Sequence, residues 1–374
     1  MKIKKSLLYC CLTSLLLSGC TTKKSNTELQ QFSMTSTTLG FDTVITFTAY
    51  TKDETTFKNY ESILKKDFKH YDQLFDKYHS YDTINNIKTI NDQAGQKPVK
   101  VDNDIFELLS LAKEFDSISN HKFSVTMGSV LNIWHDTRTQ AEKNDKEITL
   151  PSMDVLNEAN SHTGWNFVEL NEKDKTVFIK NKDTQLDVGA IAKGYAVEKI
   201  AKKLEKAGLE HAIINAGGNV RLIGTKPDNK PWSVGLQIPD HKQLSTESLI
   251  SLLIKDSTSF VTSGDYQRYF EYNGKLMHHI IDPSTLMPAR YCRSVTVITK
   301  DSGIADMLST TLFTMSYQDG VNLLKQLKKD KNIEAEAIWV YDDTILPDND
   351  VKTLYKASDY YLLFTDGVKQ MIKE

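Results

Sequence analysis

One stretch of ten residues, DVGAIAKGYA at positions 187–196, constrains the fold of this chain more than any other. Its pattern predicts a strand that ends at Asp187 and a helix that starts at Gly189, with Lys193 in the first helical turn. The free N–H groups of a first turn attract anions, and the lysine adds positive charge. Small residues at 189, 190, 192, 194 and 196 let a ligand or another backbone approach closely. The stretch therefore predicts either an anion site or a helix packed tightly on a sheet.

Two common phosphate-binding loops are absent from the sequence. Gly194 is followed by Tyr195 rather than by Lys and then Ser or Thr, which excludes a P-loop at this point. No G-x-G-x-x-G follows a predicted strand, so a Rossmann dinucleotide site is unsupported.

Helix and strand patterns alternate irregularly along the chain, without the βαβ repeat of a doubly wound fold. Apolar or small residues recur at helical spacing over residues 54–76, 104–117, 189–207, 303–315 and 318–328. Alternating or β-branched segments predict strands at residues 41–50, 167–170, 176–179, 186–188, 211–215, 232–238, 259–262, 269–272, 277–281, 294–299, 335–341 and 360–364. We therefore expect an α+β fold in which mixed or antiparallel sheets pack against helices.

The N-terminus has the features of a bacterial lipoprotein signal. A positive segment at residues 1–5 precedes a short apolar run at 7–17, which is too short to span a bilayer comfortably. The run ends in LSGC, so small residues immediately precede Cys20. We expect residues 1–19 to be a removed signal peptide, Cys20 to carry a fatty acyl group such as palmitate, and residues 20–36 to be a polar tether. A single domain, residues 37–374, would then lie outside the cytoplasm, anchored to the cell membrane. The alternative is an ordinary cleavage site that happens to contain a cysteine.

Charge and cysteine content exclude several classes of protein. The 46 basic and 49 acidic residues give a net charge of −3, and no basic stripe interleaved with aromatic residues offers itself to nucleic acid. Of the four cysteines, Cys10 and Cys11 would leave with the signal and Cys20 would be lipidated, so only Cys292 remains. An intramolecular disulfide framework and a CxxC site are thereby excluded. Any metal must be bound by oxygen or imidazole ligands.

A double glycine follows the predicted strand at 211–215, in the segment NAGGN. Gly217 and Gly218 permit positive φ and can expose N–H groups to a phosphate. A simple tight turn is the alternative interpretation.

Two polar segments, TSGDY at 262–266 and HHIIDP at 278–283, flank the strong turn signal Asn273-Gly274. A hairpin through that turn would bring Ser263, His279 and Asp282 near one sheet end, where a histidine can act as a base. The alternative is a hairpin whose Asp-Pro only starts a turn. A zinc site is disfavoured, because adjacent histidines on a strand face opposite ways.

The predicted helix at 303–315 carries Asp306 and Thr310 four residues apart, so both oxygens lie on one face. A carboxylate and a hydroxyl, completed by carbonyl or phosphate oxygens, suit Mg²⁺. A polar helix face with an inward threonine is the alternative.

Together these segments resemble the motifs of the ApbE family, the FAD:protein FMN transferases, in order and spacing from about Phe41 to Thr311. The resemblance implies a bilobed ApbE-like α+β fold and an exported Mg²⁺-dependent enzyme. Such an enzyme transfers the FMN half of FAD to a Thr or Ser hydroxyl of a target flavoprotein through a phosphoester bond and releases AMP.

The resemblance also implies roles for residues at the matching positions. Mg²⁺ would be held by the Ala190 carbonyl, Asp306 and Thr310, and His279 would be the base that deprotonates the acceptor hydroxyl. Phe41 stands where many relatives have Met, and Ser124 where Asp is frequent, which affects individual FAD contacts rather than the reaction class. The residues expected to bind FAD are Phe41, Ser124, Val125, Thr126, Asp187, Lys193, Gly217, Gly218, His279, Ile281 and Ser309.

Two other functions remain open at the level of sequence. The same site would serve a Mg²⁺-dependent FAD pyrophosphatase that gives FMN and AMP, with water in place of the acceptor. A non-catalytic, lipid-anchored flavin-binding protein would need neither the Asp306/Thr310 pair nor His279.

Overall fold

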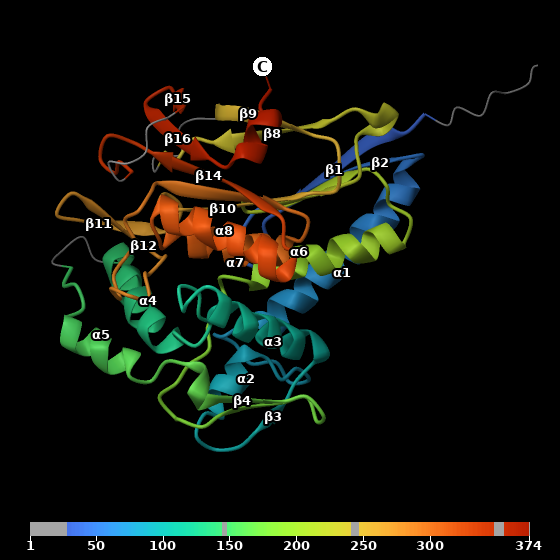
Figure 1. The fold of residues 1–374 in the computed structure, drawn as a ribbon. Coiled ribbons are helices and arrows are strands. Elements are labelled where there is room, and N and C mark those ends of the chain that lie inside the picture. Colours follow the sequence, from blue (N-terminus) through green and yellow to red (C-terminus); the bar gives the residue numbers. More distant parts are fainter. Residues whose placement is uncertain (1–27, 144–147, 241–246, 348–354, 374) are drawn as a thin grey trace, which may run out of the picture.

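The computed structural model describes residues 28–143, 148–240, 247–347 and 355–373. Its centre is a nine-stranded sheet in which every neighbouring pair of strands is antiparallel (Figure 1). In spatial order the strands are β1 (Gln30–Ser36), β2 (Ile45–Thr51), β6 (Ala212–Ala216), β7 (Asn219–Ile223), β10 (Ser259–Gly264), β13 (Ser294–Thr299), β14 (Ala335–Tyr341), β16 (Tyr360–Phe364) and β15 (Tyr355–Ala357).

Helices cover one face of this sheet (Figure 1). They are α1 (Glu54–Phe75), α6 (Ala192–Lys206), α7 (Ser302–Phe313) and α8 (Tyr317–Lys331). β2 shows why this face is apolar, because its alternate residues Ile45, Phe47 and Ala49 are buried in the core shared with these helices. Full burial of each such large side chain contributes about 1.5–3 kcal/mol.

The other face of the sheet is covered by the hairpin of β8 (Trp232–Gln237) and β9 (Ser248–Ile254). The interior strand β14, between β13 and β16, is buried on both faces: Ala337 and Trp339 pack toward the helices, and Ile338 and Val340 toward the hairpin. This double burial explains its continuous apolar sequence.

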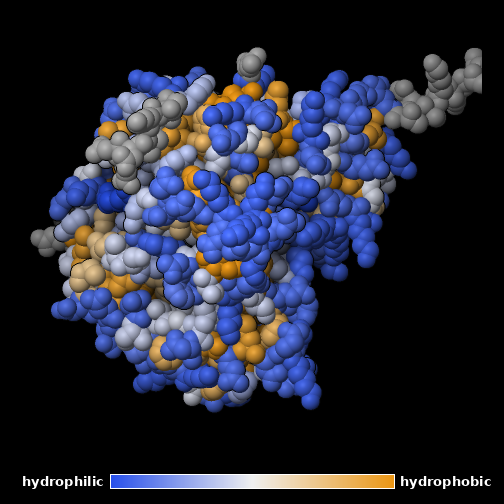
Figure 2. Space-filling view, viewed as in Figure 1, coloured by the Kyte–Doolittle hydropathy of each residue, from blue (hydrophilic) through white to orange (hydrophobic). Residues whose placement is uncertain are grey.

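The remaining elements lie below the central sheet in Figure 1, except the hairpin of β11 (Tyr269–Tyr272) and β12 (Lys275–His278), which lies at its left. They are α2 (Ile87–Asp92), α3 (Asn103–Ile118), α4 (Gly128–Lys143), α5 (Met153–Asn160), the small sheet β3 (Val99–Lys100), β5 (Thr176–Ile179) and β4 (Val168–Asn171), and the hairpin of β11 and β12. A third apolar cluster joins α4 and α5 to that hairpin. The face shown in Figure 2 is mostly hydrophilic, with hydrophobic residues in small separate patches. Among the described residues, no helix is long and apolar enough to cross a membrane.

The fold class predicted from sequence is confirmed, but many element bounds differ by a few residues, and α2, α4 and α5 were not predicted. Residues 30–36 were assigned to the tether and instead form β1, because Phe32 and Met34 alternate with polar residues and pack on the core. Phe41 and Asp42 have φ angles of 59° and 46° and form a turn, so the strand predicted from residue 41 starts at Ile45. Residues 186–188 form no strand, and α6 begins at Ala192 rather than at Gly189. The predicted signal peptide and Cys20 lie outside the described residues.

Candidate active site

The crossing of α6 and α7 brings Asp306 beside Lys193. The small residue Gly194 makes the crossing close: a Cβ at this position would lie 2.3 Å from the Ser302 carbonyl oxygen and 2.5 Å from the Asp306 Cβ. The Gly194 N–H donates to Asp306 Oδ2 at 2.7 Å, and Lys193 Nζ lies 3.9 Å from Oδ1. Asp306 is only 4% exposed. Burial raises the pKa of its carboxyl, and the Lys193 charge and the Gly194 hydrogen bond offset part of that rise.

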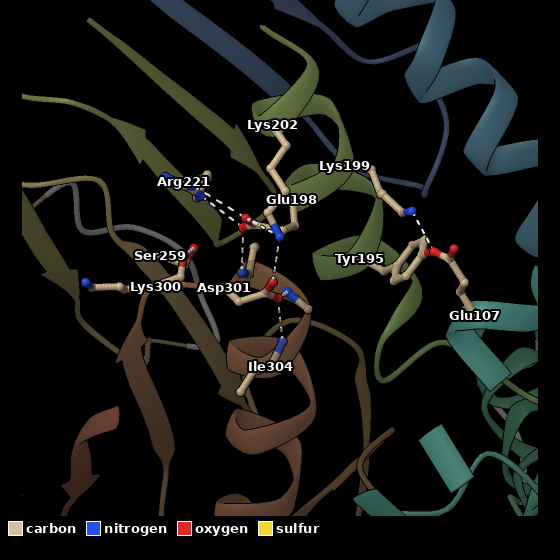
Figure 3. A network of polar contacts seen from close by, with 12 residues as sticks. Glu107, Tyr195, Glu198, Lys199, Lys202, Arg221, Ser259, Lys300, Asp301 and Ile304 are labelled. Atoms are coloured by element: carbon tan, nitrogen blue, oxygen red, sulfur yellow. Dashed lines mark hydrogen bonds and ion pairs between the residues drawn. The ribbon is translucent and has the colours of Figure 1, made fainter. Parts of the chain in front are cut away.

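A polar network fixes the start of α7 (Figure 3). Asp301 caps the helix through the N–H groups of Gly303 and Ile304, at 2.9 and 3.1 Å. Glu198 of α6 accepts from the Ser302 N–H at 2.9 Å and from Arg221 Nε at 3.0 Å. Because α7 is held at its first residues, Asp306 is fixed one turn further along.

Hydroxyl groups surround the next turn of α7. Ser263 Oγ of β10 lies 2.8 Å from Ser309 Oγ and 3.3 Å from Thr310 Oγ1. Ser309 also donates to the Asp306 carbonyl oxygen at 3.0 Å. Ser263 thus contacts α7, whereas the Asp282 carboxylate accepts from Lys122 Nζ and from the Tyr291 hydroxyl, each at 3.1 Å.

The donor set near Asp306 suits a hard cation. Asp306 provides a carboxylate, Thr310 a hydroxyl on the same helix face, and Ala190 a carbonyl in the turn that leads into α6. In the described parts of the chain, no group of three or more His, Cys, Asp or Glu residues could hold a metal. A cation here would therefore be bound by one carboxylate and neutral oxygens, a set that favours Mg²⁺ over zinc.

Asp187 pairs with a lysine that sequence analysis did not identify. Lys77 Nζ, beyond the end of α1, donates to Asp187 Oδ2 at 2.7 Å and to Asn132 Oδ1 at 2.8 Å. The Gly189 N–H donates to Asp187 Oδ1 at 2.9 Å. Burial raises the pKa of Asp187, but the Lys77 charge and hydrogen bond outweigh it, and the net pKa is lowered. Since the partners lie 110 positions apart and Lys77 belongs to no motif, the sequence offers no signal for this pair.

The segment 124–126 lies beside Asp187, because the Asp187 N–H donates to the Val125 carbonyl at 2.8 Å. Ser124 Oγ and Thr126 Oγ1 are 2.9 Å apart, and both residues line a cavity of about 410 Å³. Val125 is 1% exposed and packs in the core.

The turn at Phe41 meets the double glycine. The Phe41 N–H donates to Asp72 Oδ1 at 2.7 Å, and its ring packs edge-on against Phe68 at 6.3 Å. A Cβ on Gly217 would lie 1.9 Å from Thr43 Oγ1, and the Gly217 N–H donates to the Val44 carbonyl at 3.1 Å. Gly217 and Gly218 have φ angles of 55° and 87°, and the Gly218 N–H donates to Asn215 Oδ1 at 3.1 Å, so the geometry is that of a tight turn whose two N–H groups are both used within the chain.

His279 and His278 differ in their surroundings. His278 Nε2 donates to the Ala289 carbonyl at 2.7 Å and Nδ1 accepts from the Ile280 N–H at 3.2 Å, which fixes a neutral ring. The His279 Nδ1 atom is buried and has no hydrogen-bond partner within the described residues. Burial, then the neighbouring His278 and Arg268, lower the pKa of His279 to about 3. Ile281 lies two residues on, in a bridge with Pro288.

Comparison with known proteins gives the same family for most of the chain. The profile of the ApbE family matches residues 41–335. The chain is 32% identical over 280 residues to the FAD:protein FMN transferase of Klebsiella pneumoniae, which covers 72% of this chain and 80% of that protein. It is 31% identical over 271 residues to the FAD:protein FMN transferase of Treponema pallidum, with 69% and 71% covered.

Solved structures show the same architecture. The ApbE protein of Thermotoga maritima matches with a TM-score of 0.74 and 26% identity, covering 92% of this chain and all of that one. The flavin transferase ApbE of Vibrio cholerae matches with a TM-score of 0.69 and 20% identity, covering 92% and 99%. The second likeness concerns the fold alone.

Proposed function

This chain belongs to the ApbE family, and from that membership we propose that it transfers the FMN moiety of FAD to a target flavoprotein. The hydroxyl oxygen of an acceptor Thr or Ser attacks the phosphorus of the FMN half. A phosphoester bond forms, the pyrophosphate P–O bond breaks, and AMP leaves. The observation that carries this proposal is the buried Asp306, held by Gly194 and Lys193 with Thr310 one turn further on.

Charge neutralisation is the first requirement of this reaction, because the pyrophosphate of FAD is anionic. Asp306, Thr310 and the Ala190 carbonyl would hold Mg²⁺, which when bound neutralises phosphate charge and activates the leaving AMP. Lys193 Nζ, 3.9 Å from Asp306, supplies a further positive charge to the same anion. FAD itself would be bound by Asp187, Lys193, Phe41, Ser124, Val125, Thr126, Gly217, Gly218, Ile281 and Ser309.

Removal of the acceptor proton is the second requirement, and His279 is the residue assigned to it. Its ring is neutral at physiological pH, so it can accept a proton. Burial is the main cause of this low pKa, and His278, Arg268 and Arg138 add to it. Binding of the diphosphate adds negative charge and raises that pKa toward the range of a useful base.

The N-terminal signal supports a place outside the cytoplasm. Cys20 would carry the lipid that anchors the chain to the cell membrane. Since β1 begins at Gln30, the tether between the lipid and the folded domain would end before that residue.

The test uses the soluble chain from Thr21 with FAD, MgCl₂ and a soluble flavoprotein domain that contains an acceptor Thr. Intact-mass spectrometry should show a gain of one FMN on that domain, lost with EDTA and with Asp306→Ala. FMN and AMP in solution without an adduct would instead identify a pyrophosphatase. Intact FAD retained on the protein, with no adduct on two different acceptor domains, would identify a binding protein.

A further inference from the structure

Helix α4 borders the candidate active site, although no motif in the sequence pointed to it. Asn132 Oδ1 accepts from Lys77 Nζ at 2.8 Å, and the His135 ring lies 5.4 Å from the ring of Tyr78. Lys77 also donates to Asp187 at 2.7 Å. The side of α4 that carries Asn132 and His135 therefore lies against the segment that holds the Asp187 carboxylate.

The next basic residue on α4, Arg138, is largely buried without a close carboxylate. Its side chain is 16% exposed, and its one ion pair among the described residues is with the exposed Glu142, at 3.8 Å. Its Nη2 lies 3.2 Å from Nδ1 of His135, whose pKa is lowered by burial, so that ring is neutral at pH 7. By contrast, Arg221 and Arg293, which are 5% and 10% exposed, each pair with two carboxylates. A buried cation is costly unless an anion compensates it, so Arg138 is suited to a bound anion.

The hairpin of β11 and β12 brings a second arginine to the same region. The third apolar cluster packs α4 against this hairpin (Figure 1). The His279 N–H donates to the Arg268 carbonyl at 3.1 Å, and Arg268 Nη2 lies 3.5 Å from the Asp42 carbonyl oxygen, in the turn that follows Phe41. Burial lowers the pKa of Arg138, and the Arg268 charge lowers it further. Burial is also the main cause of the low pKa of His279, to which both arginines add. The two guanidinium groups and the His279 ring therefore lie in one positively charged region.

The lysines of the site already have carboxylate partners, whereas these arginines have no close one. Lys77 pairs with Asp187 at 2.7 Å. Lys193 lies 3.9 Å from Asp306. The proposed reaction brings an anion to the arginines, because a hydroxyl that gives its proton to His279 must also lie about 3 Å from the phosphorus that it attacks. Planar guanidinium groups match phosphate oxygens in pairs of hydrogen bonds.

We propose that Arg138 and Arg268 bind the phosphate group that is transferred with FMN, beside His279 and apart from the carboxylate of Asp306. This inference rests on the proposed function, because that function places the phosphate beside His279. The oxygens of the transferred phosphate that take no part in bond making or breaking stay negatively charged throughout. Guanidinium groups next to them therefore stabilise both the bound flavin and the transition state.

The test measures the binding of riboflavin and of FMN to the soluble chain from Thr21 in EDTA, by the change in flavin fluorescence. The two ligands differ only in the phosphate, and the wild type should bind FMN more tightly. Arg138→Gln and Arg268→Gln should each weaken FMN binding roughly tenfold or more, the factor expected for a lost charge-assisted hydrogen bond, and change riboflavin affinity less than about twofold. The control is Arg290→Gln, an exposed residue that donates to the Leu276 carbonyl at 3.1 Å. It removes the same charge and should leave both affinities unchanged.

Three results would overturn the inference. The first is equal affinity of the wild type for the two flavins, or unchanged FMN affinity in both variants. The second is an equal loss of riboflavin and FMN affinity, which would show that the arginines only support the fold. The third is unchanged flavin affinity with a raised Michaelis constant for the acceptor domain, which would assign the arginines to a carboxylate of the acceptor.

Two further variants and one outcome keep the test independent of folding and of the proposed function. Arg268 is exposed, so Arg268→Gln should fold even if Arg138→Gln does not. Arg138→Lys keeps the charge and should retain most of the preference for FMN over riboflavin. If the wild type prefers FMN through these arginines but transfers none, the proposed function fails and the phosphate site stands.

Discussion

Replacing Gly194 by alanine tests whether the close crossing of α6 and α7 builds the active site. The added Cβ would lie 2.3 Å from a backbone oxygen of Ser302, whereas ordinary contact begins near 3.4 Å, so the helices must separate by about 1 Å. Overpacking of this kind costs about 1–3 kcal/mol, and the better helix propensity of alanine returns up to about 1 kcal/mol. We expect a net destabilisation of about 1–2 kcal/mol.

The effect on transfer should be larger than the effect on stability. Separation of the helices moves Asp306 away from the Gly194 N–H and changes its distance from Lys193. A displacement of 1 Å in a positioned catalytic group can lower a rate by about 10²-fold. Thermal unfolding and the FMN-transfer rate at saturating FAD and Mg²⁺ measure the two effects separately.

Gly303→Ala is the matched control, because Gly303 lies in α7 at the same crossing. Its added Cβ would approach Asp301 Oδ1 at 3.2 Å and the Tyr195 Cα at 3.5 Å, contacts that small shifts relieve. This variant should retain most of its activity. If Gly194→Ala transfers FMN as fast as the wild type, the crossing does not determine the position of Asp306 and the reasoning is refuted.

Three further predictions concern single contacts. Lys77→Met leaves Asp187 largely buried and unpaired, which should cost about 3 kcal/mol in the free energy of unfolding and move the acidic limb of the pH–rate profile to higher pH. The sign follows from the lowered pKa of Asp187: the ion pair stabilises the fold above the unfolded pKa of 3.8, and this stabilisation is lost as the pH falls through the folded pKa. If the acidic limb of the pH–rate profile does not move, Asp187 takes no part in the reaction. His279→Ala breaks no hydrogen bond at Nδ1, so FAD affinity and folding should persist while the rate of FMN transfer falls about 10²–10⁴-fold. A single-turnover assay measures this rate, and a wild-type rate would show that His279 is not the base. Gly217→Ala should lower the melting temperature more than Gly274→Ala. Both glycines have positive φ, but only at Gly217 would the added Cβ meet a neighbour, Thr43. Equal decreases in melting temperature would show that φ alone determines the cost.

Local patterns predicted most of the fold. The strands at 294–299, 335–341 and 360–364 have the bounds expected from their β-branched and aromatic runs. The helix expected at 54–76 is α1, which Asp53 caps through the Thr56 N–H at 2.7 Å. In each case the signal lies within one segment, in its periodicity and its flanking residues.

Contacts between distant segments were not predictable from such patterns. β1 is polar on its outer face and stable only because Phe32 stacks on Phe57 of α1 and its backbone pairs with β2. Lys77 matters because it pairs with Asp187, and Gly217 matters because it packs closely on Thr43. In each case the partner lies far away along the chain. A single sequence carries no local trace of these partners, since each residue alone is ordinary for a helix end or a turn.

Of the two interpretations of the 187–196 stretch, the structure shows the tightly packed helix, and the anion site stays a prediction. The small residue at 194 lets α6 pack closely on α7, while the same helix also packs on β6 and β7 of the sheet. That packing alone brings the Gly194 N–H to Asp306 and sets Lys193 3.9 Å from the same carboxylate. A larger residue at 194 would remove the packing and the charge cluster together. Selection for a cation-binding carboxylate at this crossing would therefore act on the glycine as strongly as on the aspartate.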